Sequence, residues 1–310
     1  MRLFFNIVEG RKRYFLLSGI IISLGLIAMI YSWATTGAPF VLGVDFRSGT
    51  RFEVQFTEPV TENQVRDVFN EFGISNPNVI ALRGENLENA WQIRTEFVDN
   101  EEQNAIVSAL NDLSPLVPDT TETQSISPAI GQEVTRAAFI AILVASVIVL
   151  IYIMAVFRQM ANPFRYGACA VIAMLHDLFV IFSFAAITGT LFGWEVDSLF
   201  LTAALTVAGF SLQDTIVVFD RIRENSRKRP NERYETVVNR SILETIHRSL
   251  ATQLNAMFVL VAILLFGGES IKPFIAVLFV GLLSGTYSSI FTAVPMLVAW
   301  EKNEIPFLKA

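Results

Sequence analysis

Six apolar runs divide this chain, and each is long enough to cross a lipid bilayer as a helix, which takes about 20 apolar residues. The runs are Tyr14–Tyr31, Ala137–Phe157, Tyr166–Ile187, Ser198–Phe219, Leu250–Phe266 and Phe274–Trp300. The composition agrees, because 53% of the residues are hydrophobic and only 17% are charged, below the usual quarter. The sequence therefore predicts an α-helical polytopic membrane protein with six transmembrane helices.

Lys and Arg gather in alternate connections between these runs. They lie in the N-terminal segment, in the second connection (Arg158 and Arg165), in the fourth connection (seven residues between 221 and 240) and in the C-terminal tail. The long first connection instead holds 6 Arg, no Lys and 16 Asp plus Glu. Because cytoplasmic loops carry the excess of Lys and Arg, both termini are predicted to be cytoplasmic.

The pattern divides the chain into four parts. We expect a cytoplasmic N-terminus with the first helix over residues 1–32 and an external, periplasmic domain over 33–136. A five-helix transmembrane region over 137–300 and a cytoplasmic tail over 301–310 follow.

The external domain has the strand and helix signals of a small α+β fold. Alternating or β-rich segments over 50–57, 78–83, 91–97 and 120–127 predict four strands, and amphipathic segments over 61–72 and 100–113 predict two helices. The order β-α-β-β-α-β predicts a ferredoxin-like domain. It holds no His and no Cys, so we interpret its acidic residues as a solvated surface. The alternative is a contact surface for something that crosses the membrane.

Four polar residues interrupt the apolar runs: His176 and Asp177 in the third, Asp214 in the fourth and Arg248 at the start of the fifth. Ionisable side chains in a transmembrane helix cost about 2.5–3.5 kcal/mol on insertion scales and often mark ion or proton paths. Asp214 follows Asp197 by 17 residues and Arg248 precedes Gly267 by 19. These spacings put both at about 25–28 Å from the outer ends of their helices.

Two interpretations of these groups remain open. Asp214 and Arg248 form either a fixed structural ion pair or a titrating pair, in which Asp214 takes up a proton when the arginine moves away. His176 and Asp177 form either part of a proton path or an internally satisfied polar pair. Ser284 and Ser288 accompany Gly281-x-x-x-Gly285 and predict a small-residue face for helix packing.

Several functional classes lack any signal in the sequence. It contains no Walker loop, no Cys/His metal-binding spacing and no nucleophile–base motif, and its single cysteine is Cys169. We therefore predict a protein that is not an enzyme and that needs no cofactor and no metal.

Several motifs occur in an order that resembles the SecF-type members of the SecD/SecF family of protein-export membrane proteins, within the wider group of RND-type transporters. They are LGVDFRSGT (42–50), ISPAIGQE (126–133), LHDL (175–178), AGFSLQDTIVVFDRIREN (208–225), NRSI (239–242) and FGGESI (266–271). Two departures stand out. The family commonly has Thr-Gly-Gly where this chain has Arg47-Ser48-Gly49, and Asn where it has Gln213.

This resemblance implies half of an RND-like helix bundle in the bacterial cytoplasmic (inner) membrane. It implies a subunit separate from SecD that uses the proton-motive force to promote protein export. Asp214 and Arg248 stand at the family's proton-pathway positions. The implied partners are SecD as an obligate partner, the SecYEG translocon, a YidC-type insertase, the exported polypeptide and membrane lipid, but no nucleic acid.

Two other functions remain as alternatives. One is half of an RND-type exporter of small molecules or lipids, although an external domain of about 80 residues is small for a substrate cleft. The other is a passive scaffold that holds the translocon and insertion factors together, with Asp214 and Arg248 static.

Overall fold

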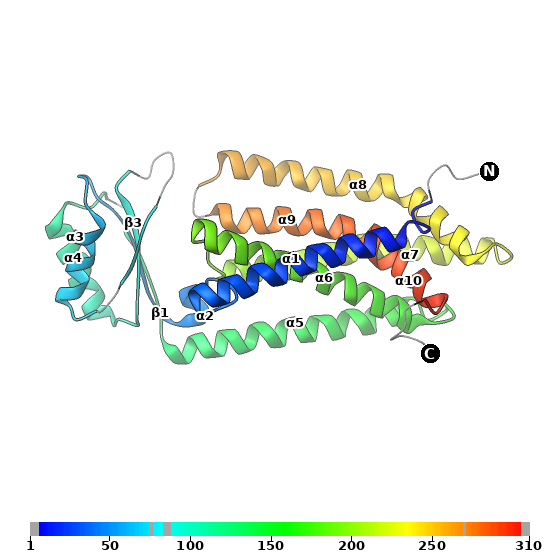
Figure 1. The fold of residues 1–310 in the computed structure, drawn as a ribbon, viewed down its shortest axis with the longest axis horizontal. Coiled ribbons are helices and arrows are strands. Elements are labelled where there is room, and N and C mark those ends of the chain that lie inside the picture. The colour runs from blue at the N-terminus through cyan, green and yellow to red at the C-terminus, as the bar shows by residue number, and fades with distance from the viewer. Residues whose placement is uncertain (1–5, 75–76, 83–87, 119, 269–270, 305–310) are drawn as a thin grey trace. The chain divides into compact units, whose positions relative to one another are not determined.

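The computed structural model describes residues 6–304 except 75–76, 83–87, 119 and 269–270. The end of the predicted strand 78–83 and most of the tail 301–310 therefore lie outside the described residues. The chain forms two compact units, Leu42–Phe139 and a second that joins Met1–Val41 to Ile140–Ala310. Figure 1 shows long helices in the second unit, and a sheet covered on one face by α3 (Glu62–Glu71) and α4 (Asn100–Leu113) in the first.

Within the described residues, six helices are long and apolar enough to cross a membrane, as the sequence predicts. They are α1 (Arg11–Thr36), α5 (Pro128–Val156), α6 (Pro163–Phe192), α7 (Ser198–Lys228), α8 (Tyr234–Phe266) and a sixth over 272–301. Each extends beyond its apolar run because helical hydrogen bonding continues into the polar flanks. The chain is therefore a helical polytopic membrane protein with a small sheet domain.

The sixth helix is not uniform. It consists of α9 (Lys272–Ser288), a π-helical turn η2 (Ser289–Ala293) and α10 (Val294–Glu301). Pro295 follows the π turn, and a proline has no N–H and clashes with the carbonyl four residues earlier, here that of Phe291. The wider π turn accommodates this proline, and such turns are frequent at functional sites.

The helices divide into inner and outer members. In the most apolar 18 residues of α6, α7 and the sixth helix, about half of the residues are buried inside the chain. In the corresponding segments, only 6% are buried in α5 and 17% in α1 and α8. Figure 1 shows α5 and α8 at opposite edges of the bundle. The polar residues of α6, α7 and α9 therefore lie where they can meet one another rather than lipid.

The start of α1 and the end of α10 meet at one end of the bundle. Arg11 forms an ion pair of 2.5 Å with Glu304, and Lys302 pairs with Glu235 at the start of α8. The hydrogen bond from Arg11 lowers the pKa of the Glu304 carboxyl. These contacts place the start of the first transmembrane helix and the end of the sixth at the same end of the bundle. An even number of membrane crossings requires this arrangement.

The sheet unit has the predicted ferredoxin-like order. The chain runs β1 (Gly49–Gln55), α3 (Glu62–Glu71), β2 (Asn78–Ala81), β3 (Ala90–Thr95), α4 (Asn100–Leu113) and β4 (Glu122–Ile126). The sheet is antiparallel in the order β2-β3-β1-β4, with Phe52 opposite Ile93. Both side chains are fully buried beneath α3 and α4, with Phe69 and Ile106. A capping box of Thr61 and Gln64 begins α3.

A short helix that the sequence did not predict, α2 (Val44–Arg47), precedes β1 and is followed by Ser48 at φ 62° and ψ 162°. This region of backbone space suits only glycine and costs another residue about 1–3 kcal/mol. Ser48 occupies the place of the first glycine of the family pattern, so the chain carries backbone strain there.

We expect Ser48→Gly to stabilise the sheet unit by about 1 kcal/mol, because relief of strain exceeds the entropy that glycine adds to the unfolded chain. Hydrogen exchange of the β1 amides in the full-length chain should slow about fivefold. Gly73, which already adopts φ 78° in the same unit, provides the converse control: Gly73→Ser should speed exchange. Unchanged β1 exchange in Ser48→Gly would show that Ser48 is not strained.

Candidate functional site

Asp214 lies in the middle of α7, with its side chain toward α8. The residue is 5% exposed, and its Oδ2 accepts a hydrogen bond of 2.8 Å from Nε2 of Gln253. Ser249, one turn before Gln253, is also buried next to this carboxylate, but its hydroxyl has no hydrogen-bond partner in the described part of the chain. The immediate partner of this buried carboxylate is therefore a neutral amide.

Arg248 also lies on α8, but its side chain is exposed. Its charge acts on Asp214 through space, yet no described carboxylate lies within 4.0 Å of its guanidinium. Ser249 and Gln253 face the bundle, and a helix turns about 100° per residue, so Arg248 faces away from Asp214. The ion pair that the sequence suggested is not formed in this arrangement.

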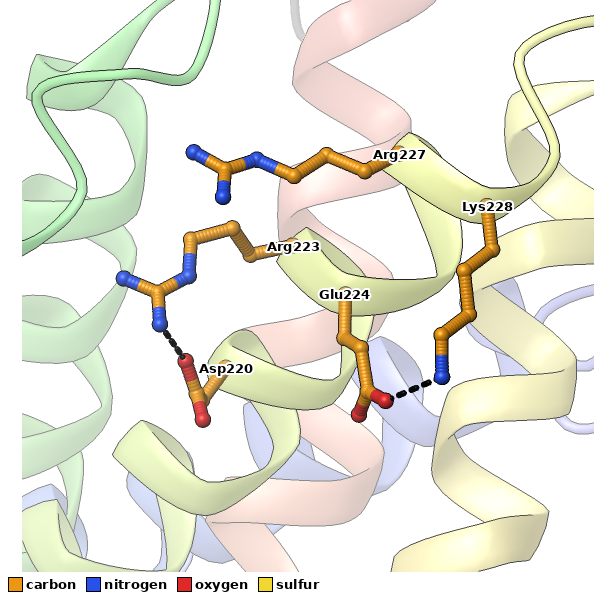
Figure 2. A pocket seen from close by; sticks show the side chains of 5 residues that line it. All are labelled: Asp220, Arg223, Glu224, Arg227 and Lys228. Atoms are coloured by element: carbon orange, nitrogen blue, oxygen red, sulfur yellow. Dashed lines mark hydrogen bonds and ion pairs between the residues drawn. The ribbon is translucent and has the colours of Figure 1, made fainter.

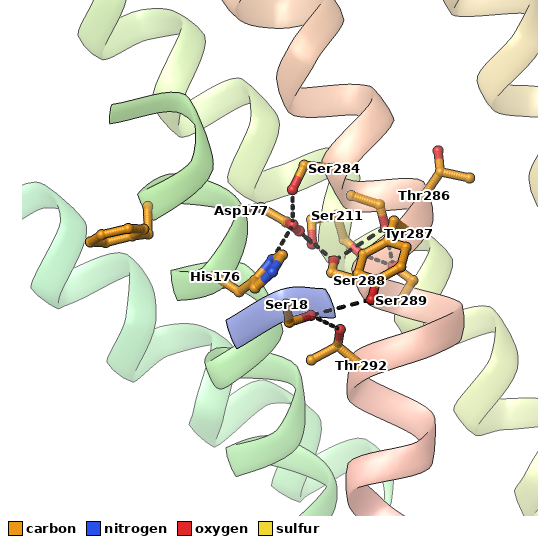
Figure 3. A network of polar contacts seen from close by, with 12 residues as sticks. Ser18, His176, Asp177, Ser211, Ser284, Thr286, Tyr287, Ser288, Ser289 and Thr292 are labelled. Carbon is orange, nitrogen blue, oxygen red and sulfur yellow. Dashed lines mark hydrogen bonds and ion pairs between the residues drawn. The ribbon is translucent and has the colours of Figure 1, made fainter. Parts of the chain in front are cut away.

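Asp177 on α6 is the centre of a second polar cluster, drawn in Figure 3. Its side chain is fully buried. Oδ1 accepts from Ser284 Oγ (2.6 Å) and lies 3.1 Å from His176 Nδ1, and Oδ2 accepts from Ser211 Oγ and Ser288 Oγ, both at 2.6 Å. The carboxylate therefore joins three helices, because Ser211 belongs to α7 and the other two serines to α9.

Further hydroxyl contacts connect this cluster to the π turn and to α1. Thr215 donates to Ser289 Oγ, and Ser289 donates to the carbonyl of Ser211. Ser18 of α1 lies within hydrogen-bond distance of Thr292 and Tyr287, as Figure 3 shows. The network thus brings together α1, α6, α7 and the sixth helix.

Among the described residues, no arginine or lysine contacts the carboxylate of Asp177. All its partners in the described part of the chain are the three serine hydroxyls and His176. The other ring nitrogen of His176, Nε2, is buried and has no hydrogen-bond partner among the described residues. His176 is therefore the only group in the cluster that can carry a positive charge.

The sequence missed Ser211 and Gln253, and it assigned Ser284 and Ser288 to packing alone. The packing is confirmed, because a Cβ on Gly281 would overlap Val207 and one on Gly285 would touch Ser211. The hydroxyls have the second role of donating to Asp177. The available signal was their spacing: Ser284 and Ser288 share a helix face, and Ser211 precedes Asp214 by three residues.

The polar end of α7 forms a hollow lined by Asp220, Arg223, Glu224, Arg227 and Lys228 (Figure 2). Arg223 pairs with Asp220 and Lys228 with Glu224, both at 2.5 Å. The charges of this hollow mostly compensate one another on one helix.

Two family models match this sequence. The model described as "Protein export membrane protein SecD/SecF, C-terminal" matches residues 106–303, and "SecD/SecF GG Motif" matches residues 33–60. Protein translocase subunit SecF of Anaerolinea thermophila is 42% identical over 302 residues, which cover 96% of this chain and 95% of that protein.

Two longer proteins are also similar. Protein translocase subunit SecDF of Bacillus subtilis is 33% identical over 97% of this chain and 38% of its own length. The crystal structure of SecDF from Thermus thermophilus, described as a translocon-associated membrane protein, superposes with a TM-score of 0.77 at 26% identity. That match covers 96% of this chain and 39% of the other. The chain therefore spans less than half the length of these SecDF proteins.

Proposed function

The chain belongs to the SecD/SecF family of protein export membrane proteins, and from this membership we propose that it promotes protein export as the SecF-type subunit of a membrane complex. Its partner is a SecD-type chain, and the complex works beside the SecYEG translocon, together with a YidC-type insertase. The proposed energy source is the proton gradient. The proposed role is conformational and includes no covalent step.

The proposed orientation follows from charge. The end of the bundle where Arg11 and Glu304 meet also holds the basic end of α7, so it faces the cytoplasm of a bacterium by the excess of Lys and Arg. The sheet unit then lies outside the cytoplasmic membrane. There it is exposed to chains that leave the translocon.

One observation carries the proposal of proton coupling: Asp214 is buried in the bundle with a neutral amide as its hydrogen-bond partner, while Arg248 on the next helix pairs with no carboxylate of the described residues. A buried carboxylate without a paired cation favours a bound proton. When the proton leaves, the negative charge attracts Arg248, and α8 turns or shifts against α7. Protonation is thereby coupled to helix arrangement.

The free energy released by one proton is enough to bias an equilibrium between two conformations of the complex. One charge that crosses a potential of 100 mV releases about 2.3 kcal/mol. This shifts a two-state equilibrium by about fiftyfold, since 1.4 kcal/mol is a factor of ten. Repeated cycles would favour forward movement of an exported chain without unfolding a stable domain in one step.

The test is completion of export in inverted membrane vesicles after ATP is removed and an ion gradient is imposed. Asp214→Asn should assemble with the SecD-type partner but lose the response to the gradient. Asp220→Asn is the matched control, because Asp220 lies on the same helix, is 56% exposed and pairs with Arg223. It should respond like the wild type.

A normal response of Asp214→Asn would overturn the coupling proposal. The chain would then serve as a scaffold for the translocon. Imposing a sodium gradient in place of a proton gradient identifies the coupling ion in the same experiment.

A further inference from the structure

The Asp177 cluster has a feature that Asp214 lacks. Each oxygen of its buried carboxylate has two polar partners, and three of the four partners are neutral hydroxyls. Such donors stabilise an ionised carboxylate. The charge nevertheless remains uncompensated in the membrane interior unless a proton joins the cluster.

His176 supplies a place for that proton. A carboxylate oxygen only accepts hydrogen bonds, so the contact of 3.1 Å requires the hydrogen of the neutral imidazole on Nδ1. Nε2 then carries a lone pair, is buried and has no partner among the described residues. An open lone pair at this position accepts a proton directly or from a water molecule.

We propose that His176 and Asp177 form a second proton-binding site of the bundle, distinct from Asp214, with Ser211, Ser284 and Ser288 as its hydroxyl shell. A proton binds to Nε2 of His176 and makes the ring an imidazolium. The Nδ1–H bond then breaks while an O–H bond forms at Oδ1 of Asp177. The histidine is left neutral as the other tautomer, so charge and protons balance.

Ser288 makes this site responsive. Its hydroxyl lies 2.6 Å from Oδ2 of Asp177 and 3.3 Å from the carbonyl of Gly285. When Asp177 is neutral, its pull on this hydroxyl weakens, because hydrogen bonds to charged acceptors are about twice as strong. Ser288 then turns toward Gly285, and one connection between α6 and α9 is released.

Ser211 relates the site to Asp214. It donates to Asp177, and Asp214 follows it by three residues on α7, about 4.5 Å farther from the α6–α7 connection. That connection is external in the proposed orientation, so a proton from outside reaches Asp177 before Asp214. This order rests on the proposed function, but the existence of the site does not.

The titratable groups around the cluster are few. Among the described residues they are His176 on α6 itself, Asp214 on α7, Tyr287 on α9 and Tyr14 on α1. Tyr287 lies with its ring 6.2 Å from that of His176 and donates to the carbonyl of Tyr14. Lys and Arg of the described residues form no contact with Asp177, so the proposed site consists of His176, Asp177 and the hydroxyl shell.

The test uses infrared difference spectra of the full-length chain in liposomes, recorded across a pH series. The C=O stretch of a protonated carboxyl is measured in Asp214→Asn, where the Asp214 signal is absent. We expect a titrating band that disappears in Asp177→Asn/Asp214→Asn. In the Asp214→Asn background, Ser288→Ala should move its midpoint upward by about one pH unit, because the carboxylate loses a donor.

Ser183→Ala is the matched control. Ser183 is a buried serine of the same helix as Asp177, and its hydroxyl donates to the carbonyl of Phe179 instead; its replacement should leave the midpoint unchanged. His176→Gln keeps a donor without the relay and should slow hydrogen–deuterium exchange of the Asp177 carboxyl about 100-fold.

The absence of an Asp177-dependent band, or equal midpoints in the Ser288 and Ser183 variants, would overturn the site. If the Asp177 carboxyl of His176→Gln exchanged hydrogen for deuterium at the wild-type rate, the relay through His176 would be overturned. None of these spectra requires export, so they succeed or fail independently of the gradient experiment on Asp214.

Discussion

Gradient-driven export should fall to the level without a gradient when Arg248 is replaced by leucine, although Arg248 contacts no described carboxylate. In the proposed cycle the guanidinium attracts the deprotonated Asp214 carboxylate in a second helix arrangement. Without it, that arrangement loses an ion pair inside the membrane. Breaking a buried pair costs about 3–5 kcal/mol, more than the 2.3 kcal/mol that one charge releases at 100 mV.

The measurement is export into inverted vesicles under an imposed gradient. Arg233→Leu is the matched control, because Arg233 stands immediately before the same helix with its side chain 82% exposed; it should keep the response. Arg248→Lys should keep part of the response to the gradient. Lysine retains the positive charge but lacks the planar guanidinium of arginine. A full response in Arg248→Leu would mean that Asp214 works without this cation.

The second large effect concerns packing of the inner helices. Gly281→Val should destabilise the bundle by about 3 kcal/mol, at the upper end of the cost of overpacking. A Cβ on Gly281 would already overlap both methyl groups of Val207, which is 1% exposed on α7. Moving α9 away from α7 would also separate Ser284 and Ser288 from Asp177. Unfolding by SDS titration in mixed micelles measures the loss.

Gly209→Val is the control for glycine replacement in these helices. Gly209 is exposed on α7, and nothing lies within 4 Å of a Cβ built there, so the change should stay within about 0.5 kcal/mol. Val207→Ala should partly rescue Gly281→Val, because it removes the atoms that the new side chain meets. Additive effects in this pair would show that the two residues are not in contact.

The site shows which properties can be predicted from residue spacing along a helix and which cannot. Asp214 and Arg248 were assigned nearly the same depth, and the structure does put them on adjacent stretches of α7 and α8. The depth of a residue in the membrane follows from the rise per residue alone. The direction in which its side chain points depends on the rotation of the helix about its axis. One residue separates exposed Arg248 from buried Ser249, and the sequence offers no means to fix that rotation within an almost wholly apolar run.

Asp177 illustrates the same limit from the other side. The free-energy cost of placing Asp177 in the membrane could be predicted from its residue type and position, and His176 could be identified as its sequence neighbour. Its three serine donors come from α7 and α9, up to 111 residues away. Serines are common in transmembrane helices, so composition could not distinguish a packing serine from one that holds a carboxylate.

The sequence by itself determined the six crossings, the ferredoxin-like strand order and the residues that are expensive to bury. These follow from hydrophobic length, local periodicity and the desolvation of charge, which act within one segment. Only the tertiary structure decided that Gln253 rather than Arg248 bonds to Asp214, and that the serines enclose Asp177. Such choices depend on how helices rotate against one another. In lipid that rotation is set by close packing and hydrogen bonds between segments, since apolar residues gain little by facing each other rather than the acyl chains.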